Sequence, residues 1–102
     1  MTELITAKAE HATLPLRALV VDDSTTIRRL MDLTLSPLGI DVEFADRGEE
    51  ALEQVKRNRY DIVFLDIMLP GIDGYRVCKQ IKAEKNTRDI PVVMLTSKGT
   101  AF

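Results

Sequence analysis

Hydrophobic and polar residues alternate with two different periods along most of the chain. Three short aliphatic runs, 17–21, 62–65 and 91–95, have the length and composition of strands that are buried on both faces. A fourth segment, 41–44, alternates polar and apolar residues, as a brief half-buried strand does. The pattern therefore predicts four strands.

Between these strands, apolar residues recur every three or four positions, which is the spacing of one helical face. The first such segment carries Ile27, Leu30, Met31, Leu35 and Leu38. Asp23 or Ser24 is its expected N-cap, and Pro37 with Gly39 is expected to end it.

Two further helices are expected. The earlier one begins at a predicted capping box, in which Asp46 is the acceptor and Glu49 stands three residues later. The later one follows two loop signals, Pro70-Gly71 and Asp73-Gly74. The residues expected on the inward faces of these helices are Ala51, Leu52, Val55, Tyr75, Cys78 and Ile81.

The alternation of strands and helices predicts an α/β fold, a doubly wound parallel sheet covered by helices. The two most apolar strands, 17–21 and 62–65, are expected side by side in the centre, with the weaker 41–44 strand at an edge. Residues 1–15 lack a sustained period and are interpreted as an N-terminal extension to a domain over 16–102. In such a sheet a crevice opens at the carboxyl ends of the central strands.

Composition narrows the class of protein. The 102 residues suit one domain, and a formal net charge of −2 offers no basic surface for nucleic acid. The single cysteine, Cys78, fits a reducing compartment. The apolar runs are far shorter than the ~20 residues that span a bilayer, and the start of the chain lacks a secretory signal. We therefore expect a cytoplasmic protein without nucleic-acid or membrane contact.

Three aspartates, Asp22, Asp23 and Asp66, directly follow the last apolar residues of the two central strands. Neighbouring strands lie only ~4.8 Å apart, and two carboxylates 4 Å apart repel by roughly 4 kcal/mol at an effective dielectric constant of 20. Taken singly, each aspartate has a simpler role as a helix cap or a strand end. Together they predict a site for a hard cation, for which Mg²⁺ is the best candidate.

A carboxylate beside a divalent cation can attack phosphorus and form an aspartyl phosphate. Thr96, at the end of the fourth strand, is expected near enough to donate a hydroxyl hydrogen bond to a phosphoryl oxygen. An ordinary β-branched strand residue is the alternative interpretation of Thr96.

The chain also resembles the receiver domains of bacterial two-component response regulators. The resemblance extends over residues 16–100, and its most specific part is the middle one of three segments. These segments are LVVDDS (19–24), DIVFLDIMLPGIDG (61–74) and IPVVMLT (90–96), to which Gly48, Ala51 and Leu52 add further matches. The resemblance implies a flavodoxin-like strand order, 2-1-3-4.

The resemblance further implies a role for each site residue. Asp66 would accept a phosphoryl group from a histidine kinase, while Asp23, Asp66 and the backbone carbonyl of Met68 would bind Mg²⁺. Asp22 would belong to the acidic pocket, and Thr96 would be the switch hydroxyl. Such a domain assists its own phosphorylation but is not a turnover enzyme, and it signals to a target protein by contact.

The sequence departs from the family after Thr96. Receivers continue with a helix, a fifth strand that ends in a lysine, and a last helix, and Lys98 does not occupy the position of that lysine. We therefore expect weakened phosphorylation, and a chain that is a fragment of a longer receiver or is completed by another chain. The exposed edge of the fourth strand would allow a homodimer or a strand-swapped assembly.

The main alternative is a pseudo-receiver, which keeps the fold and acts as an interaction module without phosphorylation. A nucleotide-binding domain would need glycines after Val21, and a haloacid-dehalogenase phosphatase would need an aspartate at Ser24. His11 stands alone and is not expected to bind metal. Tyr75 is expected to pack rather than to line the rim of the acidic pocket.

Overall fold

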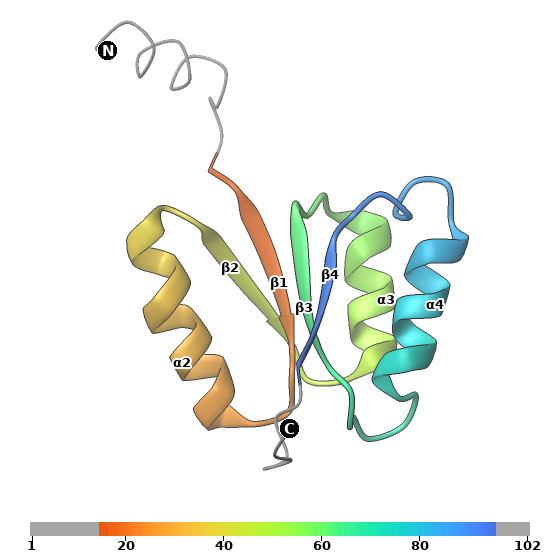
Figure 1. The fold of residues 1–102 in the computed structure, drawn as a ribbon, viewed down its shortest axis with the longest axis horizontal. Coiled ribbons are helices and arrows are strands. Elements are labelled where there is room, and N and C mark those ends of the chain that lie inside the picture. Colours follow the sequence, from red (N-terminus) through yellow and green to blue (C-terminus); the bar gives the residue numbers. More distant parts are fainter. Residues whose placement is uncertain (1–14, 96–102) are drawn as a thin grey trace, which may run out of the picture.

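The computed structural model describes residues 15–95, in which strands and helices alternate along the chain (Figure 1). The predicted strands and helices are confirmed, although β4 starts one residue later and β2 and β3 each end one residue later than expected. The elements are β1 (Arg17–Val21), α2 (Thr25–Leu35), the 3-10 turn η1 (Ser36–Leu38), β2 (Asp41–Ala45), α3 (Gly48–Arg57), β3 (Ile62–Asp66), α4 (Gly74–Ala83) and β4 (Val92–Leu95).

The four strands form one parallel sheet in the order β2-β1-β3-β4, as predicted. The most apolar strand, β1, lies in the centre, where Ala18, Leu19, Val20 and Val21 are fully buried. In Figure 1, α2 covers one face of the sheet and α3 and α4 cover the other. The arrangement is therefore doubly wound, with the carboxyl ends of all four strands at one edge.

The core fills the space between the sheet and the pair α3 and α4. Ala51 and Val55 of α3 and Val77 and Ile81 of α4 are buried against the strands. The two helices approach closely at Gly48, where an added Cβ would lie 2.4 Å from Cγ2 of Val77. A glycine is needed there because no side chain fits between the helices.

The α2 helix differs from the sequence prediction at its C-terminus. Ser24 is the N-cap, and its hydroxyl accepts a hydrogen bond from the Ile27 N–H at 3.3 Å. The helix ends at Leu35 rather than near residue 38, and Pro37 lies in the 3-10 turn that Gly39 closes with a φ of 81°. In a continued α-helix, the ring of Pro37 would clash with the carbonyl group four residues earlier. The chain therefore changes there to the tighter 3-10 conformation.

The inward face of α2 is also narrower than predicted. Leu30 and Leu38 are 56% and 71% exposed. Leu35 is the only residue of α2 that is buried. Among residues 15–95, α2 has no neighbouring helix on its own face of the sheet (Figure 1). Contact with the sheet alone buries only a narrow side of the helix.

The capping box predicted for α3 is wrong. The N-cap is Arg47, whose side chain makes no capping hydrogen bond. The Asp46 N–H instead donates to Oε1 of Glu50 at 2.7 Å. The helix begins one residue later than predicted. The glutamate that accepts a hydrogen bond from the chain before the helix is therefore Glu50 and not Glu49.

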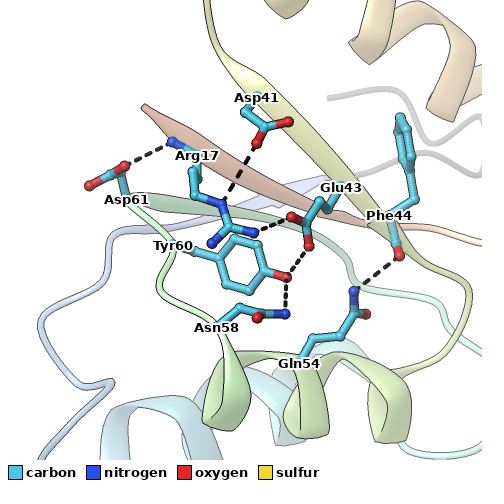
Figure 2. A network of polar contacts seen from close by, with 8 residues as sticks. All are labelled: Arg17, Asp41, Glu43, Phe44, Gln54, Asn58, Tyr60 and Asp61. Carbon is cyan, nitrogen blue, oxygen red and sulfur yellow. Dashed lines mark hydrogen bonds and ion pairs between the residues drawn. The ribbon is translucent and has the colours of Figure 1, made fainter. Parts of the chain in front are cut away.

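A polar network joins β1, β2 and the chain before β3 at the amino edge of the sheet (Figure 2). The Glu43 carboxylate accepts hydrogen bonds from the Arg17 guanidinium and from the Tyr60 hydroxyl, the latter at 2.6 Å. The Arg17 backbone N–H donates to Oδ2 of Asp61 at 2.8 Å, and the guanidinium lies over the Tyr60 ring, 5.3 Å from its centroid. This network fastens the amino ends of three strands.

Two further predictions concern the limits of the domain and the membrane. Residues 1–14 lie outside the described residues, so the division into an extension and a domain stays a prediction. Within 15–95, every helix is too short or too polar to cross a bilayer.

Candidate functional site

Three carboxylates come together at the carboxyl edge of the sheet, as predicted. Asp22 and Asp23 follow β1, and Asp66 is the last residue of β3. The parallel register pairs Val21 with Leu65, which places both strand ends at the same level. One oxygen of each carboxylate lies within 4.8 Å of the other two.

The three aspartates differ in burial and in the groups that orient them. Asp22 and Asp66 are fully buried, whereas Asp23 is exposed. The Ser24 N–H donates to Oδ1 of Asp22 at 2.8 Å, and the Met68 N–H donates to Oδ1 of Asp66 at 3.1 Å. The turns that follow β1 and β3 thus hold the two buried carboxylates in fixed orientations.

The donor set fits a hard divalent cation. Three carboxylate oxygens at this spacing repel one another, and Mg²⁺ prefers carboxylate and other oxygen ligands. Among residues 15–95, Asp22, Asp23 and Asp66 form the only group of at least three His, Cys, Asp or Glu residues with ligand atoms this close. These residues could therefore hold Mg²⁺ at the end of the two central strands.

Gly74, the first residue of α4, has a positional role that the sequence analysis missed. An added Cβ there would lie 2.2 Å from the Asp66 carbonyl oxygen and 2.8 Å from Cα of Ile67. The Gly74 N–H also donates to the Ile67 carbonyl at 3.0 Å. The amino end of α4 thus lies directly on the backbone of Asp66. The sequence predicts only a loop at Asp73-Gly74. In the structure, Asp73 is also the N-cap of α4, and its Oδ1 accepts a hydrogen bond from the Arg76 N–H.

A hollow of about 560 Å³ adjoins the site at Asp23. Two apolar side chains that line it are largely exposed, Met68 at 60% and Tyr75 at 65%. The prediction that Tyr75 packs in the core is wrong, because the face of α4 that meets the sheet carries Val77 and Ile81, and Tyr75 lies off that face. The hollow is lined by Asp23, Ile67, Met68, Leu69, Pro70, Asp73 and Tyr75.

The remaining predicted site residues are tested only in part by the geometry. Leu95, the last residue of β4, pairs in register with Asp66. Thr96, Lys98 and His11 lie outside the described residues, so their expected roles stay predictions. The Met68 N–H contacts Asp66, but the role of the Met68 carbonyl as a metal ligand stays a prediction as well.

The fold and the site together define a doubly wound α/β protein with a candidate cation site where the central strands end. A family model described as the response regulator receiver domain matches residues 18–102. The chain therefore belongs to the response regulator receiver domain family, as its resemblance implied.

Curated relatives support this membership. The chain is 44% identical over 81 residues to the "Probable transcriptional regulator ycf27" of Porphyridium aerugineum, an alignment that spans 79% of this chain and 32% of that relative. It is 41% identical over 87 residues to the "Protein PilG" of Pseudomonas aeruginosa, which spans 85% of this chain and 64% of that relative. The chain covers about a third of the length of several such relatives.

Solved structures have the same fold. A putative response regulator from Chloroflexus aurantiacus superposes with a TM-score of 0.80 at 40% identity, covering 85% of this chain and 71% of that one. The receiver domain of the sensor histidine kinase PA1611 from Pseudomonas aeruginosa superposes with a TM-score of 0.78 at 30% identity, covering 83% and 70%. The latter structure has a magnesium ion coordinated in its active-site cleft.

Proposed function

We propose that this protein is a phosphoacceptor in a two-component system, in which Asp66 receives a phosphoryl group from the phosphohistidine of a histidine kinase. The observation that carries this proposal is the convergence of Asp22, Asp23 and Asp66 at the end of the central strands of a receiver fold. A related receiver domain binds magnesium in its active-site cleft, which supports Mg²⁺ as the cofactor.

The chemistry needs a carboxylate that is held in place and an incoming phosphorus atom. A bond forms between a carboxylate oxygen of Asp66 and phosphorus while the P–N bond of the donor breaks, and the imidazole leaves with that electron pair and takes up a proton. The Met68 N–H, at 3.1 Å from Oδ1 of Asp66, keeps the carboxylate from rotating. Asp22, held by the Ser24 N–H, contributes a second buried carboxyl group to the pocket.

Mg²⁺ bound by the carboxylates of Asp23 and Asp66 and by the Met68 carbonyl would supply positive charge against the negative charge of the phosphoryl group. The hydroxyl of Thr96 is proposed to donate a hydrogen bond to a phosphoryl oxygen once the acceptor is modified. The phosphorylated form would signal by contact with a target protein. The protein is then a stoichiometric acceptor and not a turnover enzyme.

The proposed setting follows from composition. A single cysteine, half-buried Cys78, suits the reducing cytoplasm. The formal net charge of −2 disfavours a direct role of these residues in nucleic-acid binding. We therefore propose proteins, a kinase and a target, as the partners of this domain.

Intact-mass analysis tests the proposal. Wild type is incubated with Mg²⁺ and acetyl phosphate beside Asp66→Asn and the control Asp89→Asn, which changes an exposed aspartate between α4 and β4. We expect the mass of one phosphoryl group on wild type and on the control, and none on Asp66→Asn. An unmodified wild type would overturn the proposal in favour of the pseudo-receiver.

A further inference from the structure

We propose that Tyr75 forms, with Met68, the binding wall for the imidazole that leaves the phosphohistidine donor, so that it selects donors with a ring at the leaving group. This inference rests on the proposed function, because it concerns the same phosphoryl transfer to Asp66. The inference concerns the hollow beside the three aspartates. The phosphoryl transfer described above gives this hollow no role.

The position of the hollow supports this task. Asp23 belongs both to the hollow and to the group of three carboxylates, so the two regions are continuous. A donor whose phosphorus approaches Asp66 must place the rest of its structure outside the buried aspartates, where Asp23 is exposed. With a volume of about 560 Å³, the hollow has room for a side chain of the donor.

The chemistry of the lining also suits an imidazole. Tyr75 presents an aromatic ring that is 65% exposed, and Met68 presents a thioether side chain that is 60% exposed. Aromatic rings stack with one another, and a protonated imidazole is in addition attracted to a ring face. Asp73 adds a carboxylate to the same lining, although its Oδ1 already accepts the Arg76 N–H at 3.0 Å.

Local structure explains why Tyr75 is presented in this way. It stands in the first turn of α4, directly after Gly74, which lies on the Asp66 backbone. The buried face of this helix is occupied by Val77 and Ile81, so the ring of Tyr75 stays outside the core. The close contact at Gly74 thereby places the backbone of Tyr75 one residue from the Asp66 main chain.

The transfer itself is balanced without Tyr75. The P–N bond of the donor breaks, the P–O bond to Asp66 forms, and the leaving nitrogen keeps the electron pair and is protonated. Tyr75 is therefore a specificity-determining residue that contacts the leaving group and exchanges no proton. Its removal should slow transfer from donors with an imidazole and leave other donors unaffected.

Two small donors separate these effects on the full-length protein with Mg²⁺. Monophosphoimidazole carries the ring, and acetyl phosphate does not. We expect Tyr75→Ala to lower the second-order rate of phosphorylation by monophosphoimidazole between about twofold and about tenfold, with the acetyl phosphate rate unchanged. Tyr75→Phe, which keeps the ring, and Lys79→Ala, which changes an exposed residue one turn further along α4, should match wild type with both donors.

The acetyl phosphate rate also controls for damage to the fold of the site. If Tyr75→Ala slows both donors equally, or slows neither, the inference is wrong while the proposed function stands. The second result would point to Tyr75 as a contact for a target protein. If wild type accepts neither donor, the proposed function fails first.

Discussion

At the level of single residues, the neighbours of a carboxylate decide what it does. Glu43 accepts hydrogen bonds from the Tyr60 hydroxyl and the Arg17 guanidinium, so its charge stabilises the fold (Figure 2). Asp66 ends the central strand β3, and two further carboxylates lie within 4.8 Å of its own. The Glu43 carboxylate is therefore paired with hydrogen-bond donors of the protein. The three aspartates instead lie close together where a cation and a phosphoryl group are proposed to bind.

The pairing of Glu43 predicts a pH dependence of stability. The hydrogen bond from Tyr60, followed by the interaction with Arg17, lowers the pKa of Glu43, although burial opposes them. The folded protein then binds this proton less tightly than the unfolded chain. The stabilising contribution is therefore present at pH values above about 4.3 and is lost as the pH falls through the pKa of the folded state.

Chemical denaturation at a series of pH values measures this contribution. Wild type should exceed Glu43→Gln in free energy of unfolding at neutral pH, and the difference should shrink in acid. Tyr60→Phe, which removes the first cause of the shift, should move the loss toward higher pH. A difference between wild type and Glu43→Gln that is the same at all pH values would contradict the assignment.

At the level of elements, α4 lies directly against the backbone of Asp66, because its first residue, Gly74, contacts the end of β3. We expect Gly74→Ala to destabilise the protein by about 1–3 kcal/mol, since the new Cβ would lie 2.2 Å from the Asp66 carbonyl oxygen. The substitution adds helix propensity, so a loss of stability must come from this contact. The free energy of unfolding and the Mg²⁺ affinity would both be measured, and both should fall.

Gly39→Ala is the matched control for this prediction. Gly39 has a φ of 81°, and nothing lies within 4 Å of an added Cβ. Its substitution should cost stability through the backbone conformation alone, roughly 1–2 kcal/mol, without a change in Mg²⁺ affinity. An unchanged affinity in Gly74→Ala as well would show that the helix contact does not position Asp66.

Sequence patterns were sufficient to predict the strands and helices and the meeting of the three aspartates. The aliphatic runs marked β1 and β3 as central strands, and parallel strands necessarily gather their carboxyl ends, so the meeting of Asp22 and Asp66 followed. Properties that depend on a packing neighbour were not accessible. The exposure of Leu30 depends on what lies beside α2, and that of Tyr75 depends on which face of α4 meets the sheet. The Asp73-Gly74 pair marks a turn in any sequence, and only the fold shows that it contacts Asp66.

At the level of the whole molecule, the sheet has two edges of different character. The amino edge carries the network of Arg17, Glu43 and Tyr60, in which opposite charges are paired. The carboxyl edge carries the three aspartates and the adjoining hollow. The paired polar groups and the candidate cation site thus lie at opposite ends of the sheet.

The three carboxylates meet only when β1 and β3 are paired in the folded sheet. We therefore predict that Mg²⁺ stabilises the entire fold. A ligand that binds only the folded state adds about 2.7 kcal/mol at a concentration 100 times its dissociation constant. Thermal unfolding with and without Mg²⁺ should show a higher midpoint with the ion for wild type and for Asp89→Asn. The increase should be lost in Asp23→Asn. An equal increase in all three proteins would mean that the ion binds elsewhere.

The unequal burial of the three aspartates bears on the kinetics of ion exchange. Asp22 and Asp66 are closed off from solvent, whereas Asp23 is open to it. An ion would therefore enter and escape past Asp23. Any protein that docks over the hollow also covers that route, so its arrival would lengthen the residence time of the ion during the encounter.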